Sequence, residues 1–108
     1  MMANEKDTQN GRIVVRVDRD LEDLIPNFMA NRQNDLITMR NAVDTADYDT
    51  VRGLAHGLKG AGGGYGFDVL SEIAAALEQA AKAKDGGQIR VWLADLADYL
   101  EKVEIVYE

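Results

Sequence analysis

Residues 51–66 read VRGLAHGLKGAGGGYG and contain seven of the ten glycines of the chain. Each glycine inside a helix costs about 0.8–1 kcal/mol relative to alanine, so stability alone does not explain them. Placed on a helix at about 100° per residue, the apolar positions of this stretch fall on one face. The stretch therefore predicts a helix over about residues 50–65 that packs on a core through Val51, Leu54, Ala55, Leu58, Gly62 and Tyr65.

A second stripe lies beside that apolar face and points out of the predicted core. It consists of Arg52, His56, Lys59, Gly60 and Gly63, and it includes the only histidine of the protein. Residues 51–66 contain no acidic residue, although the net charge of the chain is −7. Glycine in a helix usually lets another group approach the backbone closely. The stripe is therefore a candidate functional surface.

The residue types in this stripe suit nucleophilic chemistry on an anionic group. An imidazole with one unprotonated, exposed nitrogen is a nucleophile near neutral pH. Lys59 lies one turn beyond His56, where its ammonium group can reach an anion on the ring. Gly60 and Gly63 leave space for a phosphoryl group and for the active site of a partner. For Arg52 a solvated charged flank is an equal alternative, and an ordinary surface histidine is the alternative for His56.

The glycines have two alternative interpretations, a flexible loop and a nucleotide-binding loop. Residues 60–66 could form a simple flexible loop. A phosphate-binding loop of the Walker type requires glycine immediately before the lysine, and Leu58 occupies that position. A dinucleotide-binding fingerprint requires a preceding strand, whereas residues 51–55 have the pattern of a helix. The two nucleotide-binding motifs are therefore excluded.

Apolar residues recur at helical spacing through most of the chain after Pro26. One helix is expected from Pro26 to about Ala46, and others are expected over about 50–65, about 67–84 and from about 89 to the C-terminal end. Asp47 or Asp49 can cap the helix expected over about 50–65. Three apolar faces follow from the spacing: Ile25, Met29, Arg32, Leu36, Met39 and Val43; Phe67, Leu70, Ile73, Ala74, Leu77 and Ala81; and Ile89, Leu93, Leu96, Leu100, Val103 and Tyr107.

These patterns predict an all-α fold, an antiparallel up-down-up-down four-helix bundle. A short extra N-terminal helix is expected over Leu21–Ile25, capped by Asp20. Residues 1–11 are polar and read as a loose tail. Residues 13–17 are β-branched but have no evident partner strand, so they are interpreted as an extended lead-in. The expected organisation is a flexible or extended lead-in over 1–18 and a helical bundle over 19–108.

Composition excludes several classes of function. The 108-residue chain is one domain in size, has no cysteine and has one histidine, which excludes disulfides and multi-histidine metal clusters. Its net charge of −7 disfavours nucleic acids and anionic membranes as partners. No apolar run reaches the roughly 18 residues of a membrane span, and no signal peptide is recognised. We expect a cytoplasmic monomer, and the opening Met1-Met2 favours a free-standing or trimmed protein.

The stretch His56-Gly57-Leu58-Lys59-Gly60 resembles the motif of the histidine-containing phosphotransfer (HPt) family of bacterial two-component phosphorelays. The family pattern continues with small residues and a glycine ten positions after the histidine, which Gly66 matches. Leu70, Leu77 and Glu78 resemble the next helix of the family, and the resemblance covers about residues 20–105.

The resemblance implies a role for each matching residue. His56 would be the phosphoacceptor, Lys59 would neutralise the phosphate charge, and Gly60 and Gly63, with Arg52 as a further candidate, would admit and dock the partner. The implied function is a phosphorelay intermediate that passes a phosphoryl group to or from an aspartate. The implied partners are a response-regulator receiver domain, a hybrid sensor histidine kinase, or both. No independent kinase activity, cofactor or metal is implied, since magnesium belongs to the site of the receiver.

The sequence departs from the family where many members have serine after Lys-Gly, because Ala61 and Gly62 stand here. Some members also place a polar side chain from the preceding helix against the histidine, and Asn31, Arg32 and Gln33 are the candidates. The alternative function is a non-catalytic helical-bundle adaptor that binds a receiver or kinase without being phosphorylated. A metal- or ligand-binding bundle is a third class.

Overall fold

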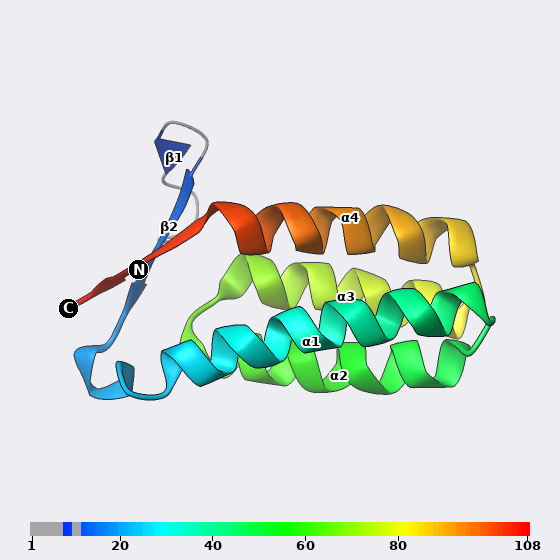
Figure 1. The fold of residues 1–108 in the computed structure, drawn as a ribbon, viewed down its shortest axis with the longest axis horizontal. Coiled ribbons are helices and arrows are strands. Elements are labelled where there is room, and N and C mark those ends of the chain that lie inside the picture. The colour runs from blue at the N-terminus through cyan, green and yellow to red at the C-terminus, as the bar shows by residue number, and fades with distance from the viewer. Residues whose placement is uncertain (1–7, 10–11) are drawn as a thin grey trace.

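A computed structural model describes residues 8–9 and 12–108 of the chain as four antiparallel helices with a small sheet at one end (Figure 1). Successive helices run in alternating directions, joined by short connections, so the predicted all-α up-down-up-down bundle is confirmed. Among the described residues, no helix is long and apolar enough to cross a membrane. The helices are α1 (Ile25–Asp44), α2 (Tyr48–Tyr65), α3 (Asp68–Lys82) and α4 (Gly86–Lys102).

The ends of α2 are set by local chemistry that the sequence encodes. Asp47 caps its N-terminus: Oδ1 accepts the Thr50 backbone N–H at 3.2 Å, and Oδ2 accepts the Thr50 hydroxyl at 2.6 Å. These hydrogen bonds lower the pKa of Asp47. At the other end, Gly66 adopts a left-handed conformation with φ +89°, which glycine reaches without steric cost. Of the two expected caps, Asp47 is the residue used.

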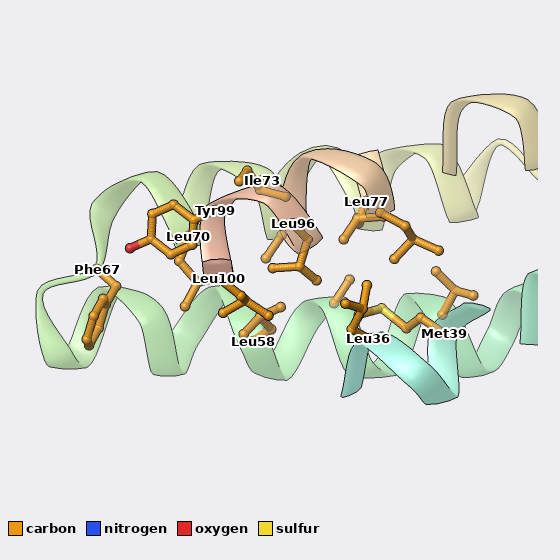
Figure 2. Close-up of a cluster of buried hydrophobic side chains, with 14 of the residues drawn as sticks. Leu36, Met39, Leu58, Phe67, Leu70, Ile73, Leu77, Leu96, Tyr99 and Leu100 are labelled. Atoms are coloured by element: carbon orange, nitrogen blue, oxygen red, sulfur yellow. The ribbon is translucent and has the colours of Figure 1, made fainter. Parts of the chain in front are cut away.

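The hydrophobic core lies between the four helices (Figure 2). Most of the residues that helical periodicity predicts to face inward belong to it. All of the expected inward residues of α3 are buried, as are Phe67 before it and the leucines of α4. The face expected for α1 is also inward, although Met29 and Arg32 are only half-buried. Side chains that are completely or almost completely buried include Met39, Phe67, Leu70, Leu77, Leu96 and Tyr99.

Gly62 permits α2 and α3 to pack closely. A Cβ atom at this position would lie 3.2 Å from the Ser71 backbone nitrogen and 3.3 Å from the Phe67 carbonyl oxygen. The same contact is held by the Ser71 hydroxyl, which donates to the Lys59 carbonyl oxygen at 2.8 Å. Because backbone atoms cannot turn aside as side chains do, a larger residue at 62 would force the two helices apart.

We expect Gly62→Val to lower the free energy of unfolding by about 1–3 kcal/mol, the usual cost of overpacking a tight contact. Urea denaturation followed by circular dichroism measures the change. Gly64→Val is the matched control, because a Cβ atom there would have no neighbour within 4 Å. Equal effects of the two substitutions would contradict the close-packing argument.

The C-terminal segment differs from the sequence-based expectation. The last helix was expected to include Val103 and Tyr107, but α4 ends at Lys102 and Val103–Tyr107 forms strand β3. β3 pairs in parallel with β2 (Arg12–Val17), so the segment interpreted as a lead-in without a partner is a paired strand. Both segments are rich in β-branched residues, which favour strands. Val15 and Val17 are fully buried, which anchors the sheet to the bundle.

The N-terminal end of the bundle also differs in detail. In place of a short helix over Leu21–Ile25, a single 3₁₀ turn spans Arg19–Leu21, and its cap is Asp18 rather than Asp20. α1 then begins at Ile25, with Pro26 in its first turn as expected. Strand β1 (Thr8–Gln9) pairs antiparallel with β2. The expected tail falls largely on residues 1–7 and 10–11, which lie outside the described residues, and the division at residue 19 stays a prediction.

Candidate functional site

The stripe predicted from the helical wheel lies on the outer surface of α2. The side chain of His56 is 71% exposed and that of Lys59 is 41% exposed. A Cβ atom on Gly60 would have no neighbour within 4 Å, and one on Gly63 would meet only the Ser71 hydroxyl at 3.8 Å. Nothing within the described molecule therefore requires glycine at position 60. The surface around the imidazole is open to an incoming group.

A buried carboxylate on the neighbouring helix connects the histidine and the lysine. The side chain of Glu78 on α3 is only 6% exposed. Its Oε2 lies 2.9 Å from Nδ1 of His56, and its Oε1 accepts a hydrogen bond from Nζ of Lys59 at 2.8 Å. Nζ of Lys82, one turn along α3, lies 4.0 Å from Oε2. A buried carboxylate is stable only when charge and hydrogen bonds compensate it, and these partners supply both.

The ionisation of Glu78 is strongly perturbed by its partners. Hydrogen bonds from Lys59 and, second, from His56 lower the pKa of Glu78 from 4.5 to about 2. Partial burial acts in the opposite direction and is outweighed. The carboxylate therefore stays negatively charged at every pH at which the protein would normally work.

This perturbation predicts how stability depends on pH. A carboxyl group whose pKa is lower in the folded state contributes stability that is complete above its unfolded value, here 4.5, and that disappears as the pH falls toward 2. Urea midpoints of wild type and Glu78→Gln, measured from pH 6 down to about pH 2, test this. The wild-type curve should fall more steeply than that of the variant below about pH 4.5. Parallel curves would show that Glu78 has no such linkage.

The bond from Glu78 also selects the tautomer of the imidazole. An ionised carboxylate only accepts hydrogen bonds, so Nδ1 of His56 must carry the proton that is shared with Oε2. In the neutral ring the other nitrogen, Nε2, then holds the free lone pair. No residue in the described part of the chain is hydrogen-bonded to Nε2. In its neutral form the ring therefore presents an unprotonated nitrogen that no described residue occupies.

Not every sequence candidate belongs to this cluster. Arg52 is half-exposed and lies 4.0 Å from Asp49, one turn before it on the same helix, so it contributes a flanking charge rather than a contact to the ring. Arg32 pairs with Asp35 at 2.9 Å and stacks over the Phe28 ring at 4.7 Å. Within the described residues, neither Arg32 nor its neighbours at 31 and 33 form a hydrogen bond with His56. The polar partner comes from the following helix instead of the preceding one.

Glu78 is the site residue whose role the sequence analysis missed, although a signal was present. Residues 74, 77 and 81 form the buried stripe of α3, and position 78 lies four residues after the first and three before the last. A glutamate at a core position is rare unless it is paired. An acid inside an apolar stripe, next to a helix that carries His56 and Lys59 without any acid, could have indicated the pairing.

The family model of the Hpt domain matches residues 23–105. The chain belongs to the Hpt domain family. No match was found among curated proteins or among solved structures. Membership confirms the resemblance seen in the motif around His56 and identifies the protein as a phosphorelay domain for histidine phosphotransfer in two-component signalling, a class that interacts with receiver domains and kinases.

Proposed function

We propose that His56 of this Hpt domain accepts a phosphoryl group on Nε2 from the aspartyl phosphate of a receiver domain and returns it to such an aspartate. The observation that carries the proposal is the 2.9 Å bond between Nδ1 of His56 and the buried Glu78. This bond supports a ring whose exposed nitrogen is the nucleophile. All residues of the proposed site come from one chain, so transfer requires only one copy of the protein.

The transfer step follows from the charges around the ring. The lone pair of Nε2 attacks phosphorus, the bond from phosphorus to the aspartate oxygen breaks, and the aspartate leaves as a carboxylate with the bonding electrons. Positive charge develops on the imidazole as the N–P bond forms. Glu78 accepts the Nδ1–H hydrogen bond throughout and stabilises that charge, much as an aspartate does for the histidine of a catalytic triad. Transfer to a second receiver is the same step in reverse.

Lys59 supplies the positive charge for the phosphoryl group in this proposal. In the unphosphorylated protein its ammonium group donates a hydrogen bond to Glu78 at 2.8 Å. Lys59 lies on the same helix as His56, one turn beyond it. A flexible lysine side chain can turn from the carboxylate toward a phosphoryl group bound at Nε2. Lys82, at 4.0 Å from Oε2, leaves Glu78 with a second cation when that happens.

We expect Lys59→Ala to slow phosphotransfer about tenfold to a hundredfold, because a charged hydrogen bond to the transferring group is lost. The helical circular dichroism spectrum should be retained, since Glu78 keeps His56 and Lys82 as partners. Single-turnover transfer from a phosphorylated receiver measures the effect. Lys59→Arg keeps the charge and is the matched control, so equal slowing in both variants would argue against neutralisation of charge as the role of Lys59.

Gly60 and Gly63 are proposed to leave the space beside His56 into which the receiver domain docks. Arg52 lies at the edge of this docking surface. The open space at Gly60 supports this role, because a side chain there would project toward whatever approaches Nε2. Arg52 is half-exposed and its only described ion pair, with Asp49, is long at 4.0 Å, which leaves it available for an acidic group of a receiver.

The proposal is tested by incubating the protein with a panel of phosphorylated receiver domains from the same organism. A label that is labile in acid and stable in alkali, present on wild type and absent from His56→Gln, is the expected result. A receiver that binds equally to both proteins while neither becomes labelled would instead identify a non-catalytic adaptor.

A further inference from the structure

Among the described residues, strand β3 forms an edge of the sheet, in which the strand order is β1-β2-β3 (Figure 1). The opposite edge, β1, has only two residues, whereas β3 has five. Natural proteins usually protect edge strands with lysine, proline, a bulge or very short length. Val103–Tyr107, with the sequence VEIVY, contains neither lysine nor proline and is of ordinary strand length. This edge is therefore suited to pairing with another strand.

The hydrogen bonds to β2 show which backbone groups face the open edge. Glu108 donates its N–H to the Val17 carbonyl at 3.0 Å, and its own carbonyl accepts the Arg19 N–H at 3.1 Å. Both backbone groups of residue 108 therefore point toward β2. Because the direction alternates along a strand, residues 104 and 106 also point toward β2, and Ile105 and Tyr107 point away from it.

We propose that a second copy of this chain pairs with β3 in antiparallel orientation, centred on Ile105. In that register the two Ile105 residues exchange their N–H and carbonyl groups, and each Tyr107 N–H reaches the Val103 carbonyl of the other copy. The pairing creates about four intermolecular backbone hydrogen bonds. The Val103 N–H takes no part, because it already donates to the Tyr99 carbonyl at the end of α4.

The pattern of charges on β3 favours the antiparallel orientation for two copies of the chain. Antiparallel pairing about Ile105 places Glu104 opposite Val106 of the second copy, and Val106 is 41% exposed and available for the contact. Parallel pairing in register would instead place each Glu104 opposite its own equivalent, and like charges directly opposite one another are destabilising. Glu104 is also paired with Arg12 at 3.0 Å on the same face, which reduces its charge at the interface.

The proposed dimer is weak and depends on salt. Two chains of charge −7 repel each other, and screening of that repulsion by salt strengthens their association. The interface lies on β3, whereas the phosphotransfer site lies on α2 and α3, so pairing does not require any site residue. The sequence-based expectation is a monomer, so the oligomeric state tests this proposal directly.

Sedimentation velocity over a concentration series, at low salt and at about 0.15 M salt, measures the association. We expect a mass that rises with protein concentration and rises more at the higher salt. Amide NMR shifts that depend on concentration should be confined to β3 and centred on Ile105. A mass that stays monomeric up to about 1 mM, where association would be weaker than about −4 kcal/mol, or shifts centred on the helices, would overturn the proposal.

A pair of charge variants isolates the proposed register. Val106→Glu places two glutamates opposite one another across the interface and should weaken association at least about tenfold, whereas Val106→Lys should preserve or strengthen it. Ile105→Pro removes an N–H that faces the open edge while leaving the pairing with β2, and it should also dissociate the dimer. Circular dichroism and labelling of His56 confirm the fold of each variant. Equal association by both Val106 variants would contradict the register.

Discussion

Replacing His56 with glutamine is expected to abolish phosphorylation of the protein while leaving the fold intact. The chain contains no other histidine, so no second imidazole can take over the nucleophilic role. The amide of glutamine can still donate to Oε2 of Glu78, so the buried carboxylate keeps its partners in the variant. We expect no label above background and an unfolding free energy within about 1 kcal/mol of wild type.

The informative comparison uses one receiver and three proteins. Wild type, His56→Gln and Glu78→Gln are incubated with the same phosphorylated receiver, and the loss of label from the receiver is followed alongside its gain by the Hpt domain. Glu78→Gln retains the nucleophile but loses the charge that stabilises the ring, so transfer should be slowed rather than abolished. Label on His56→Gln that survives alkali would place the phosphoryl group on a different residue.

Replacing Gly60 with glutamine is expected to reduce transfer about a hundredfold, because displacement of the reacting groups by about 1 Å has costs of this size. The side chain at 60 would stand one turn from the imidazole, in the open space through which the proposed partner would approach. The substitution should not harm the protein itself. Glutamine is a better helix former than glycine, and apart from the adjacent backbone of α2 the new Cβ atom would have no neighbour within 4 Å.

Gly60→Ala separates the effect of blocking the space beside His56 from the effect of a higher helix propensity. Its methyl group is small, so transfer should remain close to wild type, while the thermal midpoint should rise in both variants because each removes a glycine from the middle of α2. Phosphotransfer rates and melting temperatures of wild type, Gly60→Gln and Gly60→Ala test this prediction. Normal transfer by Gly60→Gln would show that the partner does not approach over this turn of the helix.

The helical part of the fold could be predicted because its signals are local. The apolar stripes of α1, α3 and α4 repeat at helical spacing, and Asp47, Pro26 and Gly66 mark helix ends through their own side chains or backbone freedom. The outward stripe with His56 and Lys59 follows from the same helical geometry. These features depend on residues within a few turns of one another.

The features that helical periodicity did not predict depend on contacts between distant segments. Val103–Tyr107 continues the apolar spacing of α4, and its pairing with residues 13–17, almost the whole chain away, decides between helix and strand. The link between Glu78 and His56 joins positions 22 residues apart on different helices. Helical periodicity places each residue on its own helix but does not determine how two helices are rotated against each other.

Glu78 supplies the site with a function that the motif around His56 lacks. The motif around His56 supplies a nucleophile and a cation, but no group in it can fix the tautomer of the ring. The carboxylate of α3 does so, and it also accepts a hydrogen bond from Lys59 beside the ring. The close packing of α2 on α3 at Gly62 sets the distance between the two helices on which this arrangement depends.

The central claim, that Nε2 of His56 is the phosphoacceptor because Glu78 holds the proton on Nδ1, can be tested by NMR of the ring nitrogens. The protein has one histidine, so long-range proton–nitrogen spectra contain a single imidazole and need no assignment. We predict an Nδ1–H tautomer in the neutral ring and phosphorus attached to Nε2 after reaction with a phosphorylated receiver. Phosphorus on Nδ1, or an Nε2–H tautomer in the unphosphorylated protein, would contradict the account.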